Sequence, residues 1–196
     1  MKKLFLIPIL IFIICKVTSA QTADSIHNLT AYGNFGLVRN VTSFDYEFSG
    51  LDRNGIIGNF KVMWKPDYLL RAGLEVSMSD VYSVEQSSVP TDSGVTNLKT
   101  NVYAWTFMGV FSMSPIENLE VNLATGLAFT TVKNSAFGNE SSSTDFGSVF
   151  MLSTAYYFPV TKDFNPGLEL RGMKIAKYDD YTIALQISFM YKFLKW

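Results

Sequence analysis

The sequence predicts an all-β protein, an eight-stranded antiparallel up-and-down transmembrane β-barrel. Three observations predict this fold: a strictly alternating final segment, seven further segments of the same period, and connections that alternate between short and long. In the final segment, Tyr181 to Phe193, every second residue is apolar or aromatic. In water so long an apolar face would need a covering layer, but in a bilayer it can face lipid.

The first 20 residues are predicted to be a secretory signal peptide. Lys2 and Lys3 precede an apolar run from Leu4 to Ile14, and Thr18-Ser19-Ala20 supplies small residues for cleavage. The run is too short to span a bilayer as an anchor. The predicted organisation is a cleaved signal at residues 1–20, a short periplasmic segment at 21–28 and a barrel at 29–196.

The composition of the mature chain excludes several classes of function. Removing the signal removes three lysines and no acid, which leaves 13 basic and 17 acidic residues and a formal charge of −4, so nucleic acid is not an expected partner. The single cysteine, Cys15, lies in the signal, so disulfides and thiol catalysis are excluded. The full sequence contains sixteen phenylalanines and ten tyrosines, residue types that favour strands and membrane interfaces.

Eight segments of period 2 are separated by turn signals. In chain order they are residues 29–41, 55–65, 68–82, 98–113, 118–132, 146–159, 166–177 and 181–193. Their connections near residues 65–67, 114–117 and 160–165 are short, and those at 42–54, 83–97 and 133–145 are long and polar. Short turns on one rim and long loops on the other are typical of outer-membrane barrels, and an even number of strands brings both termini to one side.

Each segment has a candidate lipid face. For the first six and the last segment, in order, these faces are Ala31, Gly33, Phe35 and Leu37; Ile56, Gly58, Phe60, Val62 and Trp64; Leu70, Ala72, Leu74, Val76 and Met78; Tyr103, Trp105, Phe107, Gly109, Phe111 and Met113; Leu119, Val121, Leu123, Leu127 and Phe129; Phe146, Phe150, Leu152, Tyr156 and Phe158; Ile183, Leu185, Ile187, Phe189, Tyr191 and Phe193. The first and seventh segments are less regular. In the first, the candidate face alternates with Tyr32, Asn34, Gly36 and Val38, and in the seventh Leu168 and Leu170 share a face with Gly172 and Lys174. Lys174 is expected near the outer rim, where its stem reaches the headgroups.

A soluble eight-stranded sandwich or lipocalin-like barrel, with its apolar face inside, is the alternative fold. The opposite faces of the segments argue against it. They carry small or amide-bearing residues such as Asn34, Ser77, Asn122 and Gln186, which fit a crowded polar lumen better than a solvent face dense in lysine and glutamate.

The signal peptide, the eight alternating segments and the C-terminal Phe189-Met190-Tyr191-Lys192-Phe193 resemble the small outer-membrane barrels of the OmpA and OmpX type. The resemblance implies a multi-pass protein in the outer membrane of a diderm bacterium, surrounded by outer-membrane lipid and lipopolysaccharide. In that family an aromatic residue ends the last strand and is read by the barrel assembly machinery. The residues that match are Phe189, Tyr191 and Phe193, with Trp196 as the alternative last aromatic.

The inward phase of the segments places seven charged residues in the lumen. They are Lys61, Arg71, Glu75, Glu120, Glu169, Arg171 and Lys192. Lys61 and Arg71 are equidistant from Pro66, so they are expected to face each other across the first turn, with acids nearby. One interpretation is a salt-bridge network that fills a lumen too narrow for a water channel, and the other is a gated or very narrow ion path.

The sequence offers little for catalysis. Hydrolytic outer-membrane barrels need a histidine beside a serine or an equivalent arrangement, and the only histidine, His27, precedes the first strand. No Gly-x-Ser-x-Gly, His-Glu-x-x-His, Walker or CxxC pattern occurs. We therefore expect no enzyme, cofactor or metal, and a structural or surface-interaction role through loops that meet an unknown extracellular ligand. A narrow pore or small-solute conduit is the alternative.

Overall fold

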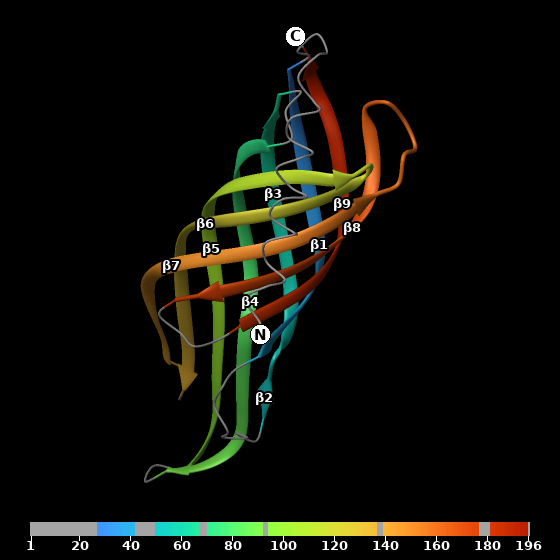
Figure 1. Cartoon of the computed structure of the whole chain (residues 1–196). Coiled ribbons are helices and arrows are strands. Elements are labelled where there is room, and N and C mark those ends of the chain that lie inside the picture. The colour runs from blue at the N-terminus through green and yellow to red at the C-terminus, as the bar shows by residue number, and fades with distance from the viewer. Residues whose placement is uncertain are drawn as a thin grey trace, which may run out of the picture.

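The computed structural model describes residues 27–41, 50–66, 70–91, 94–136, 139–176 and 181–195. They form nine strands (Figure 1): β1 Asn28–Val41, β2 Leu51–Asp52, β3 Asn54–Lys65, β4 Leu70–Thr91, β5 Gly94–Ile116, β6 Leu119–Ala136, β7 Asn139–Tyr157, β8 Phe164–Ile175 and β9 Tyr181–Lys195. No helix in these ranges has the length and apolar character needed to cross a membrane. The predicted signal peptide and residues 21–26 of segment 21–28 lie outside the described residues.

Eight strands close into an antiparallel ring in the order β4, β3, β1, β9, β8, β7, β6, β5, with β5 pairing back to β4. The first and last strands pair along their whole length, from Asn28 opposite Lys195 to Val41 opposite Tyr181. This pairing removes the two edges that an open sheet would leave. The predicted eight-stranded up-and-down barrel is therefore confirmed, and β2 is a two-residue addition that pairs with β4.

The prediction of long loops at 83–97 and 133–145 was wrong. β4 and β5 continue as a ladder to Thr91 opposite Gly94, and β6 and β7 continue to Ala136 opposite Asn139. Both hairpins leave the barrel at the same end, opposite to the short turns, as the lower part of Figure 1 shows for β4 and β5. Of the loop at 42–54, residues 42–49 lie outside the described ranges.

Gly50, at the end of that loop, has a positive φ of 86° and lies against the β4 hairpin. A side-chain carbon there would lie 2.0 Å from the Glu85 carbonyl oxygen, and the Gly50 carbonyl accepts a hydrogen bond from the Glu85 N–H at 3.0 Å. Glycine is therefore required for the approach of β2 to β4.

The two faces of the wall are those predicted. On β1, the side chains of Phe35 and Leu37 are 58% and 72% exposed on the outside, whereas Tyr32 is completely buried inside. The lumen combines buried apolar residues such as Met63, Val110 and Met151 with buried polar and charged ones. Because the continuous apolar surface is outside, the wall suits a membrane-spanning barrel and not a soluble one.

Candidate functional site

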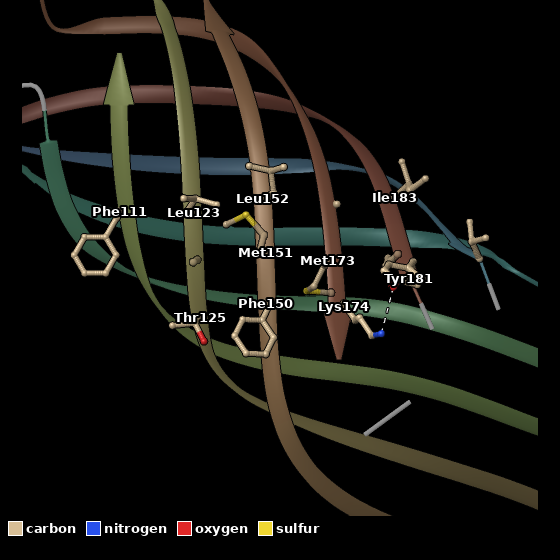
Figure 2. A pocket seen from close by; sticks show the side chains of 14 residues that line it. Phe111, Leu123, Thr125, Phe150, Met151, Leu152, Met173, Lys174, Tyr181 and Ile183 are labelled. Atoms are coloured by element: carbon tan, nitrogen blue, oxygen red, sulfur yellow. Dashed lines mark hydrogen bonds between the residues drawn. The ribbon is translucent and has the colours of Figure 1, made fainter. Parts of the chain in front are cut away.

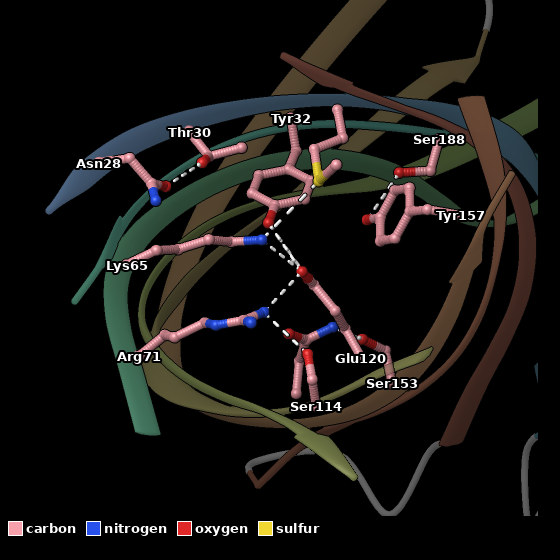
Figure 3. A network of polar contacts seen from close by, with 12 residues as sticks. Asn28, Thr30, Tyr32, Lys65, Arg71, Ser114, Glu120, Ser153, Tyr157 and Ser188 are labelled. Atoms are coloured by element: carbon pink, nitrogen blue, oxygen red, sulfur yellow. Dashed lines mark hydrogen bonds and ion pairs between the residues drawn. The ribbon is translucent and has the colours of Figure 1, made fainter. Parts of the chain in front are cut away.

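The lumen is the candidate site, because the charged residues that strands β3, β4, β6 and β8 turn inward meet there. A first group surrounds Glu120 near the short-turn end (Figure 3). The Tyr32 hydroxyl donates to both Glu120 oxygens at 3.1 and 3.2 Å, and the Lys65 ammonium donates to Oε1. Arg71 Nη1 donates to the same oxygen at 2.9 Å and to Ser114 Oγ at 2.8 Å. One carboxylate thus faces two cations.

A second group lies deeper in the lumen and is centred on Arg171. Its guanidinium donates to both oxygens of Glu75, at 2.6 and 3.0 Å, and to Glu169 Oε1 at 3.1 Å. Asn34 Nδ2 donates to the other oxygen of Glu169 at 2.7 Å. A bidentate guanidinium–carboxylate pair of this kind has a fixed geometry as well as a strong charge-assisted bond. These side chains are almost inaccessible to solvent, so they close the middle of the lumen.

Lys61 is fully buried between these two groups. Its ammonium lies 4.5 Å from the centre of the Tyr32 ring, a cation–π distance, and has no hydrogen-bond partner among the described residues. Tyr32 is also 5.0 Å from the Lys65 ammonium. The ring therefore lies against two lysines while its hydroxyl binds Glu120.

The expected contact of Lys61 with Arg71 across the first turn does not form. In the register of β3 and β4, Lys61 lies opposite Glu75, and Trp64 lies opposite Ala72. Lys65, the inward residue that follows Trp64, is therefore level with Arg71, and both donate to Glu120. The error arose from measuring both residues from Pro66, because the turn is not centred on it.

Lys192 stands apart from the other six predicted residues. It lies at the rim of a polar cavity of about 210 Å³ at the short-turn end, which Lys65, Arg71 and Glu120 also line. Among the described residues it takes part in no ion pair. The structure thus brings together five of the seven predicted charges in two groups, with Lys61 buried between them, and leaves Lys192 at the entrance.

The sequence analysis missed Lys65, Tyr32 and Tyr157 as lumen residues. Tyr157 contacts the Tyr32 ring, with 5.7 Å between ring centres, and its hydroxyl shares a 3.1 Å hydrogen bond with Ser188. Lys65 could have been found, because the alternation that turns Lys61 inward turns it inward too. The same alternation turns both tyrosines inward, because Tyr32 and Tyr157 each lie between two residues of the predicted lipid face.

The predicted C-terminal aromatics lie on the outer face. Phe189, Tyr191 and Phe193 are about half exposed, and Phe189 stacks on Phe164 with 6.1 Å between ring centres. The register of β1 with β9 shifts between Leu29 and Thr30, which leaves Phe193 as the extra residue of a bulge. Trp196 lies outside the described residues.

The turn before β8 is tied to the end of β9. The Asp163 carbonyl accepts a hydrogen bond from the Lys192 N–H at 2.8 Å, and the Asp163 carboxylate pairs with the Lys195 ammonium. The side-chain hydrogen bond from the Lys195 ammonium lowers the pKa of the Asp163 carboxyl group below its usual value.

The remaining groups that catalysis or metal binding could use are scattered. His27 stacks on Trp64 with 5.7 Å between ring centres, at the short-turn end of the wall. Across the described ranges, no three histidine, cysteine, aspartate or glutamate side chains are grouped as metal ligands would be. The charges of the two lumen groups bind one another.

Comparisons with known proteins agree with this architecture. No protein-family model matches the sequence, and no curated protein does. Among solved structures, Neisserial surface protein A matches with a TM-score of 0.56 at 12% identity, over 87% of this chain and 100% of that one. Ail, the attachment invasion locus protein of Yersinia pestis, matches with a TM-score of 0.52 at 13% identity, with the same coverage.

A major outer membrane protein from Thermus thermophilus matches with a TM-score of 0.50 at 9% identity, over 85% of this chain and 99% of that one. Identities this low carry the fold and not the function. Together with the closed ring and the outward apolar face, these matches bear out the resemblance drawn from the sequence. The chain has the fold of the small eight-stranded outer-membrane β-barrels of the OmpA and OmpX type.

Proposed function

We propose that this protein is a non-catalytic outer-membrane barrel that acts at the cell surface through its long hairpins. Residues 1–20 are its cleaved signal peptide. Segment 21–28 and both termini of the mature chain lie in the periplasm. The observation that carries the proposal is the projection of two hairpins, β4–β5 and β6–β7, from one end of a barrel whose lumen is closed.

The β6–β7 hairpin illustrates why these projections suit a binding role. Beyond the apolar wall its residues Glu140 to Thr144 are exposed on both faces of the ladder. A hydrogen bond of 2.9 Å between Thr131 and Thr144 hydroxyls crosses the pair. Such a hairpin has no membrane or core to pack against, so its exposed side chains can contact an extracellular partner.

The structural matches support a surface role without supplying its ligand. One is a Neisserial surface protein and another an attachment invasion protein, and a structure of the latter holds the heparin analogue sucrose octasulfate. The hairpins of this chain carry mixed charges, with Lys99 and Lys133 beside Glu85 and Glu140. A polyanion is therefore not carried over as the ligand.

Two further parts of the proposal concern partners and chemistry. The outward aromatics Phe189, Tyr191 and Phe193, with Trp196, are proposed as the signal read by the barrel assembly machinery, and outer-membrane lipid and lipopolysaccharide surround the wall. The protein needs no cofactor or metal for this role. Its buried carboxylates serve the ion pairs of the lumen and not an active site.

Shortening the hairpins tests the surface role. Ser83 pairs with Asn101, and Thr131 pairs with Thr144, so each pair can be joined by an Asn-Gly turn without changing the register. Bacteria displaying the shortened barrel should lose attachment to panels of host cells and matrix proteins. Heat-modifiable gel migration should show that the shortened barrel is still folded. Equal attachment by the wild-type and shortened barrels would contradict the proposal.

A narrow pore is the second candidate, because the short-turn entrance is a polar cavity of about 210 Å³. The Arg171–Glu75 pair, whose side chains are 1% and 0% exposed, lies beyond this cavity and argues against an open path. Planar-bilayer recording separates the two functions: conductance steps above those of the bare bilayer support the pore, and their absence supports the closed barrel.

A further inference from the structure

Two hollows of the wall differ in chemistry. A groove of about 810 Å³ lies on the outside, over strands β6 to β9, and its outward lining is mostly apolar, with side chains such as Phe111, Leu123 and Leu152 (Figure 2). Lipid around the proposed membrane barrel explains that surface. The polar cavity of about 210 Å³ at the short-turn end lies inside the ring, where lipid does not reach, so its lining needs a different explanation.

The closed ring builds this cavity. Each of its eight strands contributes at least one lining residue, from Asn28 on β1 to Lys192 on β9. Asn28 lies directly opposite Lys65, and Asn165 lies directly opposite Met190. Residues that lie opposite each other share a face of the sheet, and Lys65, Asn165 and Met190 are buried on the inner one. No single hairpin could therefore form the cavity.

The charges that line the cavity are unbalanced. Three cations, Lys65, Arg71 and Lys192, face a single carboxylate, that of Glu120. Figure 3 shows Lys65 and Arg71 pointing side by side toward this carboxylate, and both donate to it. Lys192 has no ion-pair partner among the described residues, and the Asp163 carboxylate in the neighbouring turn is paired with a different lysine.

The deeper lumen does not supply the missing negative charge. There the two cations Lys61 and Arg171 are matched by the two carboxylates of Glu75 and Glu169, and all four side chains are buried. An excess of two positive charges therefore remains at the cavity. Because uncompensated charge in a confined site is unfavourable, a doubly charged anion is the complementary ligand.

Two asparagines add hydrogen-bond donors to these cations. The Asn165 Oδ1 accepts hydrogen bonds from the backbone N–H groups of Val160 at 3.0 Å and Thr161 at 3.3 Å. The Asn28 Oδ1 accepts one from the Thr30 hydroxyl at 3.0 Å, and Figure 3 shows the Asn28 nitrogen turned away from that bond. Both amide oxygens are thus occupied, which leaves the two NH₂ groups as the donors available to the cavity.

We propose that the cavity binds a doubly charged phosphate group, as inorganic phosphate or as the terminal phosphate of a small ester. Lys192 and Arg71 meet its charge, and the amides of Asn28 and Asn165 donate to its oxygens. A phosphate presents at least three acceptor oxygens in different directions, which suits donors that come from strands around a ring. The site goes beyond the proposed surface role, because no residue of the projecting hairpins lines it.

The test is isothermal titration calorimetry of the full mature barrel, refolded in non-ionic detergent and titrated with sodium phosphate at slightly alkaline pH and constant ionic strength. Asn165→Asp is the decisive variant, because the new carboxylate still accepts from Val160 and Thr161 but replaces the NH₂ donor by a negative oxygen. Asn134→Asp is its matched control. The Asn134 Oδ1 also accepts a hydrogen bond, from Thr100 at 2.8 Å, but on a projecting hairpin.

A second pair of variants tests the charge. Lys192→Gln removes one cation from the rim of the cavity. Lys162→Gln is its control, because Lys162 is an exposed lysine of the neighbouring turn and does not line the cavity. Heat-modifiable migration shows whether each variant is folded. If Asn165→Asp does not fold, Asn28→Asp makes the same change at the other amide and keeps the acceptor for Thr30.

The wild-type barrel should bind one phosphate per chain. Asn165→Asp and Lys192→Gln should each weaken this binding by at least about tenfold, since each removes a donor to a charged group. Both controls should stay within about twofold of wild type. Glycerol 1-phosphate separates the two sources of the ligand: tighter binding than that of inorganic phosphate assigns the site to an ester, and weaker binding assigns it to the free ion.

Three results would overturn the proposal. One is a wild-type barrel that releases no heat of binding with either phosphate compound. Another is equal binding by Asn165→Asp and Asn134→Asp, which would place the phosphate elsewhere. The third is binding of chloride or succinate as tight as that of phosphate, which would refute the choice of a phosphate group. Attachment assays with shortened hairpins do not involve this cavity, so their outcome leaves the titration unchanged.

Discussion

The Arg171 group allows a sharp prediction about what each of its members contributes to stability. Arg171 makes three charge-assisted hydrogen bonds to Glu75 and Glu169, and the side chains of the Arg171–Glu75 ion pair are 1% and 0% exposed. Arg171→Met leaves two buried carboxylates without their cation. Removing one partner of a buried pair costs about 3–5 kcal/mol, so we expect the free energy of unfolding to fall by about 4 kcal/mol.

Glu75→Gln should cost less. The variant keeps the shape of the side chain, and Arg171 retains its bond to Glu169. Two hydrogen bonds to a charged acceptor become weaker, which corresponds to about 2 kcal/mol. The double variant should recover about 1–3 kcal/mol relative to the sum of the single effects, because these residues share one network.

Urea unfolding in lipid vesicles, followed by tryptophan fluorescence, measures these differences. The order of the two single variants is the decisive result. If Arg171→Met costs no more than Glu75→Gln, or if the double variant equals the sum of the singles, then the guanidinium is not the centre of the group.

Three further predictions use the same unfolding assay or a bilayer recording. Gly36→Ala should destabilise the barrel by at least about 2 kcal/mol, because its new carbon would lie 2.0 Å from a backbone oxygen. The control Gly33→Ala places its carbon in open space and should change the free energy of unfolding by less than about 0.5 kcal/mol. Similar effects of the two variants would contradict the packing described. Glu120→Gln should lower the free energy of unfolding by about 3 kcal/mol, because it removes the negative charge that two cations share. Glu117→Gln in the exposed turn is the control and should leave the free energy of unfolding unchanged. Equal effects of the two variants would refute the role of Glu120. Arg171→Ala should produce small conductance steps in planar bilayers if this residue blocks the lumen, and a silent variant would place the block elsewhere.

Much of the wall could be predicted from the sequence, because lipid on one side and a packed lumen on the other impose a period of 2. Phe35 and Leu37 on β1 and Leu152 on β7 face outward as their phase requires. The pairing of β1 with β9 followed from the need to close the sheet.

The hairpin extensions could not be predicted in the same way. Beyond the membrane both faces of a strand meet water, so the apolar alternation disappears while the backbone ladder continues. Residues such as Ser141 and Thr144 then read as loop, although they pair with Asn134 and Thr131. Strand propensity alone is too weak to reveal this.

The partners of the lumen charges also escaped prediction. Inward phase identified Glu120 and Arg71 as lumen residues, but which groups meet depends on the register of each strand pair and on strands brought together across the ring. Tyr32 binds Glu120, 88 residues away in sequence. The 2.9 Å bond of Arg71 to Glu120 joins β4 to β6, two strands that are not neighbours in the sheet.

The pairing of β1 with β9 has a consequence for biogenesis. Its partners lie about as far apart in sequence as the barrel allows, so closure is the contact of highest sequence separation and carries the largest loop-closure cost. Every other strand pair joins strands that follow each other closely along the chain, and all of them except β8–β9 can form before the last strand is available. A chain that lacks β9 keeps two open strand edges, one on β1 and one on β8, each able to recruit a foreign strand. Only a chain that includes β9 can therefore close into a barrel.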